Sequence, residues 1–161
     1  MTTAQYNQCV DRYSDGVYRF ILKNIRDQDR AMDVVQDSFE KLWLKVAEIS
    51  FEKARSYLFT TAYRTMIDHI RRESHQEPME DITMNNHGYE DEYLGLKEIL
   101  DKGLSRLPAD QRSVIMLRDY EGYNYREIGE ITGLSESQVK VYIYRARAFL
   151  KNYIRRLDVV M

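Results

Sequence analysis

The sequence predicts an all-α protein: two small helical domains joined by a flexible acidic linker, the second domain containing a helix-turn-helix. Apolar residues recur at helical spacing on both sides of a polar break, and no alternating pattern indicates a β-strand. Only 2 prolines and 7 glycines occur in 161 residues, which leaves long stretches free to be helical. A hydrophobic share of 43% is sufficient for a core and argues against wholesale disorder.

The break between the domains is marked by charge and by turn-forming residues. Residues 73–92 contain Pro78 and Gly88, and they include acids but no Lys or Arg. The acids are Glu73, Glu77, Glu80, Asp81, Glu90, Asp91 and Glu92. We therefore expect a first domain at residues 1–72, a linker at 73–92 and a second domain at 93–161. The net charge of −2 hides this separation of charge, which predicts more than one partner.

Helices are expected throughout the first domain. The first is loosely patterned around Val17 and Ile21, whereas residues 30–46 carry one clear apolar stripe. The stripe consists of Ala31, Val34, Val35, Phe39, Leu42, Trp43 and Val46. A short loop at residues 47–53 precedes a helix over residues 54–72. The inward residues of that helix are Leu58, Phe59, Ala62, Met66 and Ile70.

The second domain is expected to begin with a helix over residues 94–107. Its inward residues are Leu96, Ile99, Leu100 and Leu104. Pro108 suits the first turn of the next helix, because its missing N–H would have no partner there. We expect that helix to end at Gly122.

Two helix starts then follow in quick succession, each with its own capping box. Asn124 and Glu127 cap a short helix, and Gly133 supplies its left-handed exit. Ser135 and Gln138 cap the last helix. This helix is basic, with Lys140, Arg145, Arg147, Lys151, Arg155 and Arg156, and its outward face presents Ser137, Lys140, Val141, Tyr144 and Arg145. Two short helices at a sharp angle, the second of them basic, indicate a helix-turn-helix whose second helix enters the major groove of DNA.

Two further polar faces are open to more than one interpretation. The outward face of residues 54–72 presents Tyr57, Thr61, Arg64, Asp68 and Arg71. Alone, such a face is typical of a solvated helix. Beside a DNA-binding domain it also fits single-stranded DNA, because aromatic rings stack on bases and arginines neutralise phosphates. The acidic face of residues 30–46 consists of Asp33, Gln36, Asp37 and Glu40. Composition alone does not distinguish a solvated face from a binding surface there.

No catalytic site, metal site or cofactor is predicted. His69, His75 and His87 have no ligand spacing to each other, and Cys9 lies in no nucleophile motif. The sequence has no glycine-rich phosphate loop. A single cysteine fits a reducing cytosol, and neither a signal-peptide pattern nor an apolar run long enough to cross a bilayer is present. We therefore expect a cytoplasmic protein with no membrane insertion.

Several segments, taken together in this order, resemble the extracytoplasmic-function (ECF) group of bacterial sigma-70-type sigma factors over nearly the whole chain. Residues 33–43 resemble the conserved-region-2 helix that docks on core RNA polymerase. Residues 57–64 and 67–72 resemble the helix that recognises the promoter −10 element. Pieces of the second domain resemble the region-4 lobe that reads the −35 element: Leu107-Pro108, Arg112, Leu117, Glu121-Gly122-Tyr123, Tyr125-Arg126-Glu127-Ile128, Val139-Lys140 and Arg145-Ala146-Arg147.

The resemblance implies a partner for each face. Polymerase would be bound through its clamp coiled coil by Asp33, Gln36, Asp37 and Glu40. The −10 element, including a base flipped into the loop at residues 47–53, would be bound by Phe51, Lys53, Tyr57, Thr61, Arg64, Asp68, Arg71 and Arg72. The −35 element would be bound by Ser135, Ser137, Gln138, Lys140, Val141, Tyr144 and Arg145. The acidic linker would thread the basic channel of the polymerase, and an anti-sigma factor that covers both domains would hold the protein inactive.

Two other function classes remain open on the residues alone. A stand-alone helix-turn-helix transcriptional regulator would bind duplex DNA without polymerase, although the first domain shows no ligand site. An enzyme on a helical scaffold would need clustered His and Asp pairs, which the sequence lacks. The acidic face around Asp33 and the basic last helix are complementary in charge, which would also allow the two domains to close on each other.

Overall fold

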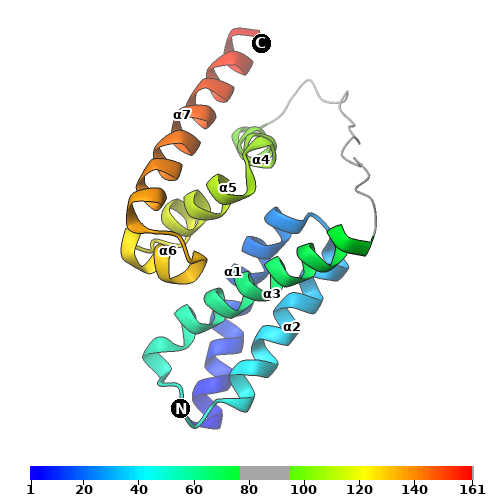
Figure 1. Ribbon diagram of the computed structural model, residues 1–161, viewed down its shortest axis with the longest axis vertical. Helices are drawn as coiled ribbons and strands as arrows, with labels where there is room; N and C mark the ends of the chain where they lie inside the picture. Colours follow the sequence, from blue (N-terminus) through cyan, green and yellow to red (C-terminus); the bar gives the residue numbers. More distant parts are fainter. Residues whose placement is uncertain (77–94, 161) are drawn as a thin grey trace.

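The computed structural model describes residues 1–76 and 95–160, and the regular elements within those ranges are all helices (Figure 1). The all-α fold class is therefore confirmed. The first lobe contains α1 (Thr3–Ile25), α2 (Gln28–Leu44), the short 3-10 helix η1 (Phe51–Lys53) and α3 (Ala54–Gln76). The second lobe contains α4 (Leu96–Arg106), α5 (Ala109–Ile115), the π-helical turn η3 (Met116–Tyr120), α6 (Tyr125–Thr132) and α7 (Glu136–Val160).

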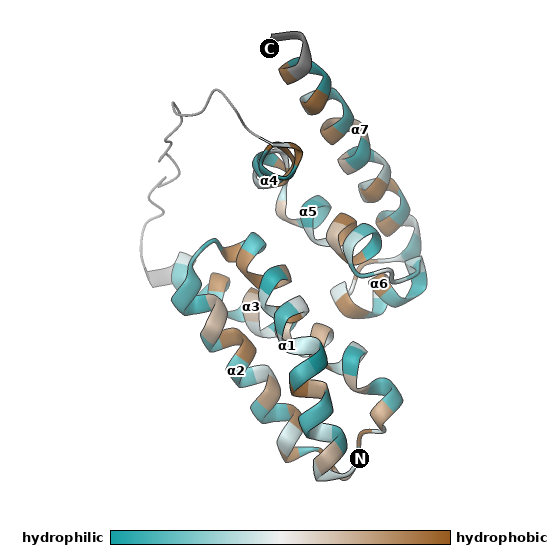
Figure 2. Ribbon diagram, turned by 180° about the vertical axis from the view of Figure 1, so that it is seen from behind, coloured by the Kyte–Doolittle hydropathy of each residue, from teal (hydrophilic) through white to brown (hydrophobic). Residues whose placement is uncertain are grey.

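The first lobe is a bundle in which α1, α2 and α3 pack on one another. Its core includes Phe20, Leu42 and Phe59, none of them more than 1% exposed. In both lobes, hydrophilic and hydrophobic residues alternate along the helices, as the helical periodicity predicted (Figure 2). The first helix is longer than its loose apolar pattern indicated, because Thr2 and Gln5 form a capping box that fixes its start.

Three residues predicted to face the core are exposed. Trp43 is 46% exposed, since its ring meets the edge of Tyr6 at a centroid distance of 5.0 Å and the rest of it faces outward. Ile70, in the last turns of α3, is 42% exposed, and Leu96, the first residue of α4, is 62% exposed. Residues near helix ends have fewer neighbouring elements to cover them, so an apolar stripe overestimates burial there.

The helix-turn-helix of the second lobe has the predicted caps. The Asn124 side chain accepts a hydrogen bond from the Glu127 N–H at 2.8 Å, and the Glu127 carboxylate accepts one from the Asn124 N–H at 2.9 Å. Gly133 ends α6 in the left-handed region with φ of 84°. The buried residues Ile131, from α6, and Ile143, from α7, belong to the shared core. The turn is therefore fixed at both of its ends.

Gly129 lets the turn pack against α6, a role that the sequence pattern did not indicate. A Cβ at this position would lie 2.8 Å from the carbonyl oxygen of Leu134. Contacts that short do not occur between well-packed atoms, so any larger residue would require the backbone of the turn to move. The turn can thus approach α6 closely because residue 129 is a glycine, which has no side chain.

The two lobes pack directly on each other through α1 and α3 on one side and α4, α5 and α6 on the other. Lys23 of α1 pairs with Asp101 of α4 at 2.5 Å, and the Phe59 and Tyr123 rings meet edge to face at 5.7 Å. A closed form is thus present. The acidic face around Asp33 takes no part in the polar contacts between the lobes that the described residues make.

The expected linker lies mostly outside the described residues. The α3 helix continues to Gln76, past the expected start of the linker at residue 73. Glu73 is helical, and its carboxylate pairs with Arg30 at the start of α2. Residues 77–92 of the expected linker lie outside the described ranges.

We expect Gly129→Ala to lower the free energy of unfolding by about 1–3 kcal/mol, because the new Cβ would meet the Leu134 carbonyl. Alanine inside a helix ordinarily stabilises it by up to about 1 kcal/mol relative to glycine. Gly16→Ala in α1 is a matched control, since the nearest atom to its Cβ would lie 3.6 Å away. Urea unfolding followed by circular dichroism measures both variants, and equal stabilities would contradict the prediction.

Candidate nucleic-acid interface

The residues expected to read duplex DNA lie together on α7 and at its start. Ser135, Ser137, Gln138, Lys140, Val141, Tyr144 and Arg145 are all exposed. Ser135 and Gln138 form the predicted capping box, with hydrogen bonds of 3.0 and 3.1 Å between side chain and backbone. The aromatic side chain of Tyr144 is 75% exposed and the aliphatic side chain of Val141 is 43% exposed. A helix face of this kind can contact base edges in a groove.

A hollow of about 490 Å³ beside this face has cationic walls. Lys140, Arg147 and Lys151 line it together with Tyr125 and Tyr144. The Lys140 ammonium lies 5.7 Å from the centre of the Tyr125 ring, close enough for a cation–π contact. Such an arrangement can accept a phosphate group.

Arg147 is held within the second lobe rather than free to solvate α7. Its guanidinium donates two hydrogen bonds to the Asp119 carboxylate, at 2.5 and 3.2 Å. The hydrogen bond with Asp119 raises the pKa of Arg147. Asp119 therefore fixes one cation of the hollow in place, which the sequence alone did not reveal.

The residues expected to bind single-stranded DNA follow one face of the first lobe. Phe51 and Lys53 come from η1, and the others come from α3. Lys53, Arg64, Asp68, Arg71 and Arg72 are exposed, whereas Phe51, Tyr57 and Thr61 are half-buried. Tyr57 also packs against the core, so its ring has a fixed position. Steps of three and four residues bring Tyr57, Thr61, Arg64, Asp68 and Arg71 onto one side of the helix.

The start of this face lies opposite α6 of the second lobe. A hollow of about 640 Å³ is lined on one side by residues that include Lys53 and Tyr57, and on the other by α6 residues that include Arg126 and Glu130. The sequence did not indicate that Arg126 and Glu130 lie opposite Lys53 and Tyr57, because the approach of the two lobes has no local sequence signal.

The acidic face of α2 is accessible. Asp33, Gln36 and Glu40 are exposed, and Asp37 is half-buried. Exposed apolar side chains occur on the same helix: Met32 at 48%, Trp43 at 46% and Leu44 at 79%. Carboxylates beside exposed aromatic and aliphatic groups form the kind of surface that binds another protein. The outward position of Trp43 therefore adds an apolar component that the sequence interpretation had assigned to the core.

Metal and membrane chemistry find no support in the described part of the chain. Over those ranges, no group of three or more His, Cys, Asp or Glu side chains is arranged to hold a metal ion. None of the helices there combines the length and apolar character that crossing a bilayer requires.

Comparison with known families assigns both lobes. Residues 9–76 match the model of sigma-70 region 2, and residues 97–150 match the model of sigma-70 region 4. The RNA polymerase sigma factor SigV of Bacillus subtilis is 30% identical over 160 residues, which cover 98% of this chain and 95% of the relative. The ECF RNA polymerase sigma factor SigM of the same organism is 28% identical over 89% of this chain and 91% of its own.

A solved structure shares the fold. The sigma factor RpoE of Bartonella quintana, crystallised with the anti-sigma factor NepR, aligns with a TM-score of 0.73 and 24% identity, over 93% of this chain and 96% of that one. The helix-turn-helix, the order of the two matched regions and the relatives that align over most of the chain all indicate the same family. The chain belongs to the ECF group of the sigma-70 family of RNA polymerase sigma factors, a family without enzymatic activity.

Proposed function

We propose that this sigma factor binds core RNA polymerase, recognises the −10 and −35 promoter elements by a two-point grip, and helps to open the promoter. The observation that carries the proposal is the exposed α7 face, which follows two successive capped helix starts in the matched region 4. Lys140, Tyr144 and Arg145 would contact the −35 major groove. Ser135 and Gln138 would act through the cap, with Ser137 and Val141 completing the surface.

The −10 element would be held by the η1 and α3 face of region 2. Extruding a base from the duplex costs a few kcal/mol, so a stacking surface must compensate for that cost. The half-buried Tyr57 supplies a ring of fixed position, and the exposed Arg64 and Arg71 would neutralise phosphates along the strand. Phe51, Lys53, Thr61, Asp68 and Arg72 are the remaining members of the proposed surface.

The polymerase would be bound through the α2 face. Asp33, Gln36, Asp37 and Glu40 would meet a basic or polar surface of the clamp, and the exposed Trp43 would add apolar contact. Because core polymerase is the partner, we place the protein in the cytoplasm.

We propose domain limits of 1–72, 73–92 and 93–161, with α3 running to Gln76. The solved relative RpoE was crystallised with an anti-sigma factor, which supports a partner of that kind here. Such a partner would hold the protein inactive by covering surfaces of both lobes. No cofactor is proposed.

The primary test is transcription from a genomic promoter library with core polymerase and the full chain. Specific start sites that depend on the chain are expected, and their absence at every promoter would refute the proposal. A stand-alone regulator would instead bind an operator without polymerase. Gel shifts with and without core enzyme therefore distinguish the two classes of protein.

Lys140→Ala should weaken binding of the holoenzyme to a promoter recovered from that library. If the Lys140 ammonium contacts a phosphate, the slope of log affinity against log salt should fall in magnitude by about 1. Lys102→Ala is a suitable control, because Lys102 is an exposed lysine of α4 on another part of region 4. Equal losses for the two variants would contradict a specific role for Lys140.

The double variant Asp33→Lys, Asp37→Lys should lower the affinity for core polymerase by about tenfold or more, because like charges at an interface cost several kcal/mol. Asp11→Lys with Asp15→Lys is a matched control. It makes the same change of charge at the same helical spacing on α1, where both side chains are exposed. Fluorescence titration of labelled chain with core enzyme measures both affinities, and indistinguishable values would exclude the α2 face.

A further inference from the structure

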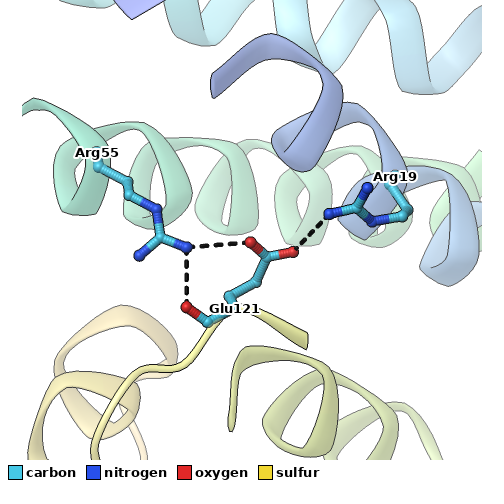
Figure 3. A network of polar contacts seen from close by, with 3 residues as sticks. All are labelled: Arg19, Arg55 and Glu121. Carbon is cyan, nitrogen blue, oxygen red and sulfur yellow. Dashed lines mark hydrogen bonds and ion pairs between the residues drawn. The ribbon is translucent and has the colours of Figure 1, made fainter. Parts of the chain in front are cut away.

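The junction between the lobes contains a nearly buried carboxylate that none of the proposed promoter contacts uses. The Glu121 side chain, which follows η3, is only 6% exposed. Its Oε2 accepts a hydrogen bond from Arg19 Nη2 of α1 at 3.3 Å, and its Oε1 accepts one from Arg55 Nη2 of α3 at 3.1 Å (Figure 3). The Arg55 group also donates to the Glu121 backbone carbonyl at 2.9 Å. One acid of region 4 thus joins two helices of region 2.

The chain path after α5 brings Glu121 to this position. Its N–H donates to the carbonyl of Met116 at 3.1 Å, which closes a π-type turn, and Gly122 follows with φ of 79°. Tyr123 comes next, and the Arg55 guanidinium lies 4.5 Å from the centre of its ring. Arg55 is therefore held by two hydrogen bonds and a cation–π contact from the same short segment.

Gly16 leaves the space that this contact occupies. A Cβ on Gly16 would lie 3.6 Å from Glu121 Oε1 and 3.8 Å from the tip of the Phe59 ring. Glycine in the interior of a helix lowers the stability of that helix. At position 16 it also leaves room for the Glu121 carboxylate. A methyl group would fit there, but a longer side chain would displace the carboxylate.

A second polar cluster fixes the same arrangement. Asn24 of α1 accepts hydrogen bonds at Oδ1 from Arg112 Nε and Ser113 Oγ of α5, both at 3.1 Å. The Asn24 amide is itself held by the Phe20 carbonyl at 2.8 Å. Two separate sets of directional contacts therefore select one orientation of region 4 on region 2.

This orientation restricts the −10 surface. The hollow in front of Lys53 and Tyr57 has α6 as its other wall, with the exposed carboxylate of Glu130 there. A DNA strand that reached Tyr57 from this side would have to enter the hollow between the lobes, because residues of both lobes line it. Glu130 is paired there with Arg126 at 3.5 Å, so α6 narrows the approach to Tyr57 mainly by occupying space.

We propose that Glu121, Arg55 and Arg19 form an intramolecular latch that holds the free protein closed, with region 4 covering the start of the −10 surface until the latch opens. The consequence for promoter binding rests on the proposed function, whereas the closed shape does not. Partners that hold the two regions apart, such as polymerase and promoter DNA, would shift the protein to the open form.

The test uses the full chain with two ways of opening the latch. Glu121→Lys places a third cation between the arginines, and Glu98→Lys makes the same charge change at an exposed position of α4. Gly16→Leu inserts a side chain at the carboxylate, and Gly16→Ala fits without displacing it. Circular dichroism of each variant is the control that checks whether the helix content is retained.

Small-angle scattering should show a larger radius of gyration for Glu121→Lys and Gly16→Leu than for the natural chain and both controls. The affinity of the free chain for a single strand with the −10 element should rise about tenfold on opening, if nine molecules in ten are closed beforehand.

A natural chain that is already as extended as Glu121→Lys would overturn the latch. Expansion without a gain in strand affinity would overturn the proposed covering of the −10 surface. Failure of the sigma-factor proposal is recognised separately, because the chain would then give no specific start site with core polymerase while the scattering result still reports on the latch.

Discussion

The arrangement of the two lobes depends on pairing one nearly buried carboxylate with two guanidinium groups. An isolated charge at the exposure of Glu121, 6%, would cost several kcal/mol, so the side chain can lie at the junction only with cations beside it. Arg19 and Arg55 come from different helices. Their common partner therefore fixes α1 and α3 relative to the segment that leads into α6, and the position of α6 in front of the start of the proposed −10 surface follows.

In α7, the residues that cap the helix differ from those of the proposed DNA-contacting face. Ser135 and Gln138 satisfy backbone groups at the start of α7, where the first N–H groups of a helix have no partner within it. The exposed Lys140 and Tyr144 then lie one to two turns further along, where the helix needs no capping. Because α6 is capped by Asn124 in the same way, both helices of the motif have defined starts, and the outward face of α7 has a defined direction.

The features predicted correctly from the sequence are those with local causes. Capping boxes, the left-handed glycine at 133 and the apolar stripes act over a few residues, so their spacing is visible in the chain. The latch joins residues 102 and 66 positions apart, and nothing in the local pattern connects Arg19 or Arg55 with Glu121. Trp43 was misplaced for a related reason: periodicity identifies an apolar stripe but not how far the neighbouring helices extend over it.

The chemistry of the junction favours a reversible contact over a permanent one. Arg19 is 48% exposed, so water and salt screen its share of the pairing with Glu121. The Tyr123 hydroxyl is buried in the closed form, and it would be exposed to water once the lobes separate. The aromatic contact between Tyr123 and Phe59 contributes about 0.5–1.5 kcal/mol to the closed form. A screened ion pair and one aromatic contact are small beside the binding energy of a large partner, so such a partner can separate the lobes.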